Sequence, residues 1–412
     1  MAASLPLSDS NYVAGEPPAF GQASNSSGRS FHAYVHIPFC RVRCGYCDFN
    51  TYTASELRGT SQAGFASVLM REIEYAGLEL ARQGFTPLRP ASTVFFGGGT
   101  PSQLPAADLA AVLARLRDTF GFTDDVEITT EANPDDVSQR FVDDLKEAGF
   151  SRVSLGMQSA VSDVLATLER THTPANVPLA IDSIKRAGLK SSVDLIYGAP
   201  GETLEQWRVS IEEAIELQPD HISAYSLIVE PGTKLARQIA KGEVAEPDED
   251  LQADKYELAE KLLSAAGFNW YEVSNWSRSR ETRSAHNIAY WKSQDWWGFG
   301  PGAHSHVGET RFWNAKHPAT YQSALDAGKP PAVGSERIDS ETRRVEKLLL
   351  EVRTFDGISV SEAKVANPNA SKVISELIAD GLIEGPKAIS GQITLTLKGR
   401  MLADHVVREL LG

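Results

Sequence analysis

The stretch YVHIPFCRVRCGYCDFNTY, residues 34–52, contains Cys40, Cys44 and Cys47, which are all the cysteines of the 412-residue chain. An odd number of cysteines leaves one unpaired, so they do not form a disulfide framework. A closed structural zinc site needs four ligands. The spacing C-x3-C-x2-C supplies three thiolates from one loop, which suits a cubane iron–sulfur cluster with one open iron. A zinc site completed by His36 or His32 is the weaker alternative, because zinc spacings usually come as paired CxxC units.

With Tyr46 directly before the third cysteine, this spacing resembles the signature of the radical S-adenosylmethionine (SAM) superfamily. In that superfamily the amino and carboxylate groups of SAM bind the open iron, and one electron from the reduced cluster cleaves SAM to a 5′-deoxyadenosyl radical. The resemblance therefore implies a [4Fe-4S] cluster, SAM as a second cofactor, and a reduced electron donor as a partner.

Length and composition limit the class of protein. The length suggests two or three domains, or one large barrel with appendages. No run of eighteen apolar residues occurs, so we expect no membrane-spanning helix. Residues 1–30 lack a basic start and an apolar core, and we expect a flexible tail there. Thiols that must stay reduced favour the cytoplasm. A net charge of −14 offers no basic surface for a nucleic acid.

Strand-like and helical stretches alternate after the tail. The predicted strands are 33–37, 92–96, 126–130, 152–155, 192–197 and 221–226, and the predicted helices include 61–82, 106–120 and 204–217. This alternation predicts parallel strands with right-handed crossovers. Polar or glycine-rich residues follow nearly every strand, where barrels of this kind carry their sites. We predict an α/β fold with a partial (β/α)6 barrel over residues 31–267, and an open doubly wound sheet is the alternative.

The composition changes twice after the barrel. Residues 268–335 contain six of the seven tryptophans and form an aromatic and histidine-rich segment. Residues 336–412 show helical stretches at 341–354, 361–380 and 398–411, with alternating residues at 393–397 before the last helix. Helices with a short hairpin resemble a winged-helix domain. We predict a C-terminal α+β winged-helix-like domain that packs or binds a partner, since the chain is acidic.

Several residues at strand ends are candidates for SAM binding. GGGTPS at 97–102 forms either a tight turn or a backbone cradle for a ligand, and its place one strand after the cysteine loop favours the cradle. The alternative explanation is an ordinary solvated side chain, and it applies to Glu131, Gln158 and Arg170. Asp194 differs because it lies inside the apolar run SVDLIYG, where a buried carboxylate needs a partner such as a ligand hydroxyl or ammonium group.

The motifs YEVSNW, SAHNIAYW and WWGFGPGAHSH at 271–306 interleave aromatic rings with polar groups. The rings could simply seal the lower mouth of the barrel. Alternatively, flat apolar walls with an imidazole fit a planar macrocycle, since histidine is a common axial ligand of haem iron.

Taken in order, HIPFC, GGGTPS, EANPD, GMQS, DLIYGAPGE, YEVSNW, HNIAYW and GFGPGAHS resemble the oxygen-independent coproporphyrinogen III oxidase-like family from about residue 31 to the end. The haem-chaperone (HemW-type) branch is the nearest match. The resemblance implies that Cys40, Cys44 and Cys47 bind the cluster beside Tyr46. It further implies that Tyr34, Gly98, Gly99, Glu131, Gln158, Arg170 and Asp194 surround SAM. The HNxxYW motif, His286, Asn287, Tyr290 and Trp291, is linked to haem in that branch.

One departure separates the two branches. The oxidase motif has a further cysteine two places after the third, and this chain has Phe49 there. We therefore expect a haem chaperone that holds haem near His286 and transfers it to an apoprotein. The alternative is an oxidase that decarboxylates coproporphyrinogen III to protoporphyrinogen IX through the 5′-deoxyadenosyl radical. A radical methyltransferase is a third, weaker hypothesis. Whether the protein is an enzyme stays open, and no catalytic residue is assigned.

Overall fold

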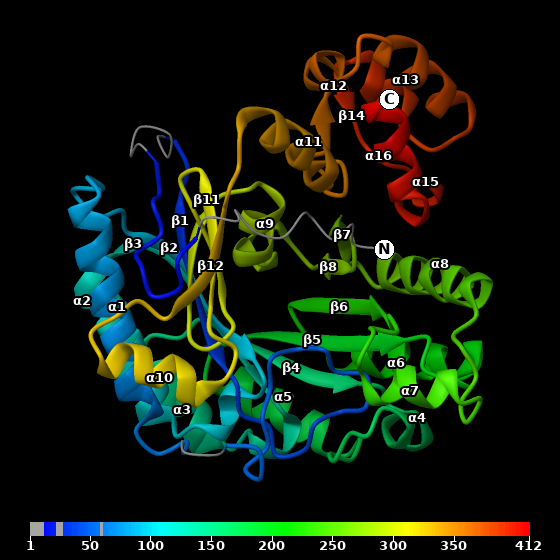
Figure 1. Ribbon diagram of the computed structural model, residues 1–412. Coiled ribbons are helices and arrows are strands. Elements are labelled where there is room, and N and C mark those ends of the chain that lie inside the picture. The colour runs from blue at the N-terminus through cyan, green and yellow to red at the C-terminus, as the bar shows by residue number, and fades with distance from the viewer. Residues whose placement is uncertain (1–11, 22–27, 58–60) are drawn as a thin grey trace.

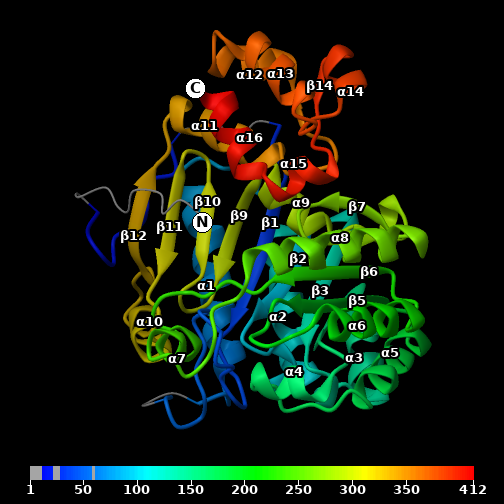
Figure 2. The ribbon, with the colours of Figure 1, turned by 90° about the vertical axis from the view of Figure 1, so that its right-hand side faces the viewer.

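The computed structural model describes residues 12–21, 28–57 and 61–412. A curved sheet of twelve strands, in the order β12-β11-β10-β9-β1-β2-β3-β4-β5-β6-β8-β7, organises the chain (Figures 1 and 2). Its centre consists of six parallel strands in sequence order: β1 (Phe31–Ile37), β2 (Ala91–Gly98), β3 (Phe122–Ala132), β4 (Arg152–Gln158), β5 (Lys190–Tyr197) and β6 (His221–Ser226). β12 and β7 are the two edges and do not pair with each other. The predicted partial barrel is therefore confirmed.

Helices cover the outer face of this sheet: α1 (Phe65–Arg82), α2 (Ala106–Phe120), α3 (Gln139–Ala148), α5 (Asn176–Arg186), α6 (Leu204–Glu216) and α8 (Glu249–Ala265). Shorter helices, α4 (Ser162–Thr167) and α7 (Lys234–Ala240), follow β4 and β6. The predicted helix at 61–82 begins four residues later, at Phe65, after the left-handed residue Gly64. Strands β2, β3 and β4 extend beyond their predicted bounds.

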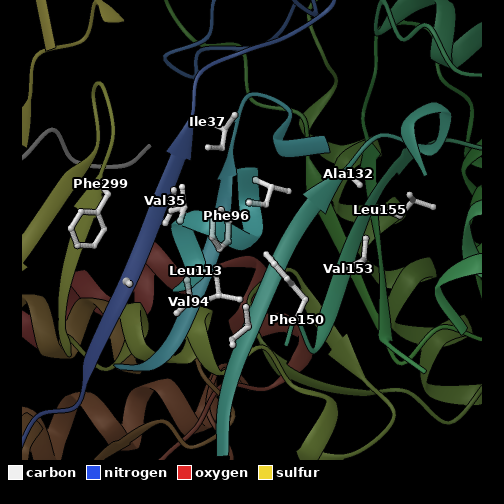
Figure 3. Packing of buried hydrophobic residues seen from close by; sticks show 14 of the residues in the cluster. Val35, Ile37, Val94, Phe96, Leu113, Ala132, Phe150, Val153, Leu155 and Phe299 are labelled. Atoms are coloured by element: carbon white, nitrogen blue, oxygen red, sulfur yellow. The ribbon is translucent and has the colours of Figure 1, made fainter. Parts of the chain in front are cut away.

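The two faces of the central strands differ in chemistry. Val35, Val94, Phe96 and Val153 point outward and pack with the helices in one buried core, which Figure 3 shows from close by. Because side chains alternate along a strand, the residues between them point to the interior of the barrel. Those interior positions carry polar groups, such as Asp194 on β5. The alternation thus separates a dry outer core from a polar interior.

The aromatic segment adds strands to both sides of the central sheet. β7 (Asn269–Glu272) and β8 (Asn275–Ser277) extend it beyond β6, where β8 pairs antiparallel. β9 (Asp295–Phe299) pairs parallel to β1, and β10 (His304–Val307), β11 (Thr310–Asn314) and β12 (Ala332–Arg337) follow. α9 (Ala285–Trp291) connects the two sides, and α10 (Pro318–Asp326) packs on α1. The predicted boundary at 335/336 lies inside β12.

The C-terminal residues form their own buried cluster from Leu348 to Leu410. Its elements are α11 (Ser340–Glu351), β13 (Ile358–Ser359), α12 (Val360–Ala366), α13 (Ala370–Ala379), α14 (Gly385–Ile389), β14 (Gln392–Ile393), α15 (Leu397–Met401) and α16 (Ala403–Leu411). The single helix predicted at 361–380 is wrong, because Pro368 separates α12 from α13. Where one helix was predicted at 398–411, the structure has two, α15 and α16. In the alternating stretch 393–397, Ile393 ends β14, Leu395 forms a bridge to Ile383, and Leu397 already begins α15.

The expected flexible tail lies partly outside the described residues, and its described part is packed. Phe20 is fully buried between Phe85, Trp297 and Phe312. The Thr310 hydroxyl donates a 2.6 Å hydrogen bond to a backbone carbonyl of the same segment. Residues 12–21 are thus anchored to the core through one aromatic side chain, while most of their other side chains are exposed or half-buried, and the flexible tail stays a prediction.

Candidate functional site

A cavity of about 580 Å³ lies inside the barrel and opens at the carboxyl ends of the central strands. Its walls are formed by alternate residues of each strand, for example Ser192, Asp194 and Ile196 of β5. All the predicted site residues except Trp291 line this one cavity: Tyr34, Cys40, Cys44, Tyr46, Cys47, Gly98, Gly99, Glu131, Gln158, Arg170, Asp194, His286, Asn287 and Tyr290. Residues spread over 257 positions of sequence thus meet in one place.

The cysteine loop is clamped at its base where it leaves β1. The Cys40 amide donates to the carbonyl of Tyr52 at 3.0 Å, and the Tyr52 amide donates to Pro38 at 2.7 Å. Within the loop, the Cys47 amide donates to the Cys44 carbonyl at 3.1 Å, which makes a tight turn. All three thiols are free and partly buried, and all face the cavity. The loop therefore presents its sulfur atoms to the interior.

Polar groups beside the thiols suit bound thiolates. The Arg170 Nη1 lies 3.6 Å from the Cys44 Sγ, and the Thr100 hydroxyl lies 3.7 Å from the Cys40 Sγ. Burial raises the pKa of Cys40 to about 11, so this thiol ionises at neutral pH only with a cation beside it. The buried hydroxyl of Thr51 also has no hydrogen-bond partner among the described residues. These side chains fit an iron–sulfur cluster.

The zinc alternative fits less well. Ligands of a single ion must converge on one point, whereas a cubane takes each thiolate on a different iron. In the described ranges, no group of three or more His, Cys, Asp or Glu side chains is placed to hold one metal ion. Both proposed histidine ligands are also engaged. The ring nitrogens of His32 contact Ser30 and Thr93, and those of His36 contact Tyr34 and Asn50.

Two glycines at the end of β2 bring its backbone close to the cysteine loop. Gly98 has a φ of 108°, and a Cβ there would lie 2.4 Å from the ring of His36. A Cβ on Gly99 would lie 2.6 Å from the backbone oxygen of Phe39. Only glycine fits these positions. The GGG motif thus lets the first two strands and the cysteine loop meet without side chains between them.

Two half-buried carboxyl groups face the cavity from β3 and β5. Burial and the charge of Asp194 raise the pKa of Glu131 to about 8, although the Gly98 amide donates to it at 3.2 Å. Burial likewise raises the pKa of Asp194, which accepts a 2.8 Å hydrogen bond from the Ser154 hydroxyl. Such a pair favours a ligand that brings positive charge or hydroxyl groups. SAM carries an ammonium, a sulfonium and two ribose hydroxyls, so these residues fit it.

Arg170 and Gln158 complete this wall. Arg170 donates to the Asn133 side chain at 2.6 Å and to the Gly156 carbonyl at 3.3 Å, while its buried Nε has no partner among the described residues. Gln158 has a φ of 62°, which is unusual for a residue with a side chain. Backbone of this kind persists only where the surrounding structure holds it in place. Both side chains line the cavity.

His286 lies deep in the barrel, and both its ring nitrogens are engaged. Its Nδ1 is 2.6 Å from the Thr93 hydroxyl, and its Nε2 is 3.0 Å from the Tyr290 hydroxyl. Its ring stacks on Phe95 at 5.0 Å, and it is only 2% exposed. Burial lowers the pKa of His286 well below its usual value, so the imidazole is neutral.

The last two residues of the HNxxYW motif differ in placement. Tyr290 lines the cavity with His286 and Asn287, whereas Trp291 lies outside the lining. Hydrogen bonds from Asn275, Trp291 and Asn287 reach Glu272, whose pKa burial nevertheless raises to about 8. The motif therefore does two things, because it lines the interior and also hydrogen-bonds a buried carboxyl group through Asn287 and Trp291.

Some lining residues carry polar groups that the sequence analysis did not select. Arg152 is 2% exposed and donates to Glu127 at 3.1 Å and to two backbone carbonyls before α9. The Nδ1 of His221 lies 2.7 Å from the Ser192 hydroxyl, and its Nε2 lies 2.9 Å from the Tyr271 hydroxyl. These residues occupy interior positions of β4 and β6. The alternation of polar and apolar residues along those strands was the available signal.

None of the helices in the described part of the chain has the length and apolar character needed to span a bilayer. Comparison with known proteins is consistent with the geometry of the site. The model of the radical SAM superfamily matches residues 34–214. The chain belongs to this superfamily, whose members carry a [4Fe-4S] cluster and SAM.

Within the superfamily the chain belongs to the HemW family. It is 43% identical to the protein named heme chaperone HemW of Mycobacterium tuberculosis, over 93% of this chain and 96% of that protein. It is 31% identical to the Bacillus subtilis protein of the same name, over 92% and 99% of the two chains. Among solved structures, coproporphyrinogen III oxidase (HemN) of Escherichia coli covers 94% of this chain, and this chain covers 92% of that one, with a TM-score of 0.78. At 22% identity this likeness shows the fold alone.

Proposed function

We propose that the protein is a haem chaperone that binds haem and transfers it to an apoprotein. The observation that carries this proposal is the full-length similarity to proteins named heme chaperone HemW, which includes the C-terminal residues beyond the barrel. The electron donor and the accepting apoprotein are further partners of this proposal. A cytoplasmic location and the division at residues 30, 267 and 335 remain predictions within it.

Phe49 supports this function over the oxidase. It stands where the oxidase motif has a further cysteine, and the residue is 66% exposed beside the cavity. A phenyl ring offers no metal ligand and no acid–base group, so it supplies nothing to a decarboxylation. It does offer apolar contact area to a macrocycle.

For the site residues, we propose that Cys40, Cys44 and Cys47 bind the cluster. We further propose that SAM binds to the wall of the cavity that carries the two glycines of β2, the two carboxyl groups of β3 and β5, and Arg170. For His286 to ligate haem iron, as the sequence predicts, one of the two hydrogen bonds of its ring must first break. Iron ligation by its Nε2 would first break the hydrogen bond with Tyr290. Ligation by its Nδ1 would break the one with Thr93.

The proposed function is tested by anaerobic titration of the cluster-reconstituted, full-length protein with haem. A saturable Soret shift at one haem per chain, followed by loss of that haem to an added apoprotein, is the expected result. In a parallel tube, coproporphyrinogen III, SAM and a reductant are supplied, and porphyrinogen and 5′-deoxyadenosine are analysed. A decarboxylated product would make the protein an oxidase despite Phe49. Absence of saturable haem binding would refute the proposed haem-chaperone function.

A further inference from the structure

Helix α9, which carries the HNxxYW motif, is held at both ends by two consecutive residues of the C-terminal part of the chain, Phe355 and Asp356. Before the helix begins, the Arg283 guanidinium lies over the rings of Tyr271 and Phe355, 5.5 Å from the centre of each. After the helix ends, the Lys292 ammonium donates a 2.6 Å hydrogen bond to the Asp356 carboxylate. Two neighbouring residues therefore fix both ends of the same helix.

These two residues belong to a short segment between α11 and β13, residues 353–356, which we call the clamp. The backbone of the clamp is fixed on the end of β7, an edge strand of the sheet. The Val273 amide donates to the Arg353 carbonyl at 3.1 Å, and the Phe355 amide donates to the Tyr271 carbonyl at 2.8 Å. An antiparallel bridge lies between these two hydrogen bonds. The clamp thus connects the C-terminal helices to the barrel.

Tyr271 continues this connection into the first turn of α9. Its hydroxyl accepts a 3.1 Å hydrogen bond from the Ser284 amide. Ser284 is the N-cap of α9, and its own hydroxyl accepts a 3.3 Å hydrogen bond from the Asn287 amide. A displacement of the clamp would therefore reach the residue at which the helix begins, two positions before His286.

The barrel holds α9 from the other side. The Ala285 and His286 amides donate to the Glu127 carboxylate at 3.2 and 3.1 Å, and the His286 Nδ1 lies 2.6 Å from the Thr93 hydroxyl. α11 packs on α9, so the helix lies between the central strands and the C-terminal helices (Figures 1 and 2). A shift of α9 away from β2 would separate His286 from Thr93 and free its Nδ1, and the clamp opposes that shift.

The side chains of the clamp are exposed enough for its contacts to break without unfolding of the protein. The Lys292 and Asp356 side chains are 39% and 57% exposed, and Phe355 is 44% exposed. Exposed ion pairs contribute little to stability, so the loss of this pair costs little. The clamp can therefore restrain α9 and still release it.

We propose that Phe355 and Asp356 are positioning residues, which hold α9 against β2 and β3 and keep His286 bonded to Thr93 until the clamp loosens. The clamp then sets the rate at which the protein takes up haem. This inference rests on the proposed function and names the part of the chain that regulates its site. Because apparent affinity is reduced by the fraction of molecules competent to bind, a looser clamp should strengthen haem binding.

Two measurements on the cluster-reconstituted full chain test the proposal: hydrogen exchange of the α9 amides without haem, and stopped-flow uptake of haem followed at the Soret band. We expect Asp356→Asn and Lys292→Met each to raise both rates at least threefold. The double variant should match the single ones, because both substitutions remove the same ion pair. Glu376→Gln is the matched control, since it breaks the exposed 3.5 Å pair with Lys372 on α13, and it should leave both rates within twofold.

Phe355→Ser tests the other end of α9, because it removes the ring beside Arg283 and leaves the ion pair in place; it should act in the same direction. A merely structural loss would lower haem uptake rather than raise it. If Phe355→Ser folds poorly, Asp356→Asn decides, since its side chain is exposed.

The outcomes separate the clamp from the proposed function. Unchanged exchange of the α9 amides in Asp356→Asn would overturn the clamp and leave the chaperone function standing, because that measurement contains no haem. Faster exchange with unchanged or slower haem uptake would overturn the control of uptake and likewise leave the function standing. If the wild-type protein shows no saturable haem binding, the proposed function fails and the control of uptake with it, whereas the exchange rates still decide whether the clamp holds α9.

Discussion

Gly99→Ala is expected to separate the cysteine loop from β2. A Cβ on Gly99 would lie 2.6 Å from the Phe39 oxygen and 2.9 Å from the Ile37 oxygen. To bring the first contact to at least 3.0 Å, the backbone must move by about 0.4 Å. Two hydrogen bonds cross this gap: the Gly99 amide donates to Ile37 and the Thr100 amide donates to Phe39, both at 2.8 Å.

The expected magnitude follows from these contacts. Overpacking in a tight site costs about 1–3 kcal/mol, and each weakened hydrogen bond costs about 0.5–1.5 kcal/mol. The free energy of unfolding should therefore fall by about 2–6 kcal/mol. Because Phe39 directly precedes Cys40, the displacement also reaches the first of the three proposed cluster ligands. We expect a folded protein with reduced iron and sulfide content and weak absorption near 400 nm.

The assay combines urea unfolding with iron and sulfide analysis after anaerobic reconstitution. Gly188→Ala is the control, because its φ of 68° strains an added side chain while nothing lies within 4 Å of the new Cβ. It should lose about 1–2 kcal/mol from the left-handed backbone and keep the full cluster. Unchanged stability and full cluster content in Gly99→Ala would refute the argument from the close approach.

Three other outcomes are expected. Cys44→Ala should abolish the visible absorption of the cluster, and an unchanged iron and sulfide content would contradict the ligand assignment. Lys255→Met should lower the free energy of unfolding by about 3–5 kcal/mol, because it strands the fully buried Glu202 carboxylate 2.9 Å away; adding Glu202→Gln should recover part of the loss in urea titrations. Burial raises the pKa of Glu72 from 4.5 to about 7. Between these two pH values the folded state therefore holds more protons than the unfolded state. Unfolding free energy should then fall by up to about 1.4 kcal/mol per pH unit from pH 4.5 to 7, and Glu72→Gln should flatten that slope.

The sequence was sufficient for the parts of the fold that local chemistry determines. α2 has the bounds that its apolar periodicity predicts, Ala106–Phe120, and β6 covers the predicted His221–Ser226. The polar residue at the end of each strand identified the edge of the sheet that carries the site. Asp194 was selected because a carboxylate inside an apolar strand needs a partner, and it does line the cavity.

Other features depend on contacts that no local pattern contains. The pairing of β9 with β1 joins residues more than 260 positions apart, and either strand could have been an edge by its own sequence. Phe20 is one aromatic residue in a tail rich in small and polar residues, and its burial depends on a gap between β9, β11 and the end of α1. The contacts of His286 likewise depend on where α9 lies, so its motif alone could not indicate that both nitrogens are engaged.

The position of α9 follows from the two sheet edges that its segment extends. β8 is fixed on β6 and β9 is fixed on β1, so the connection between them must cross the interior side of the barrel. The Ala285 and His286 amides donate to Glu127 on β3, and the His286 ring bonds Thr93 on β2. These contacts fix α9 against β2 and β3, where His286, Asn287 and Tyr290 line the cavity. A large planar ligand therefore has its access from the carboxyl ends of the strands, where Phe49 and Ile228 stand exposed. The same chain path therefore buries His286 and leaves the cavity open at the carboxyl ends of the strands.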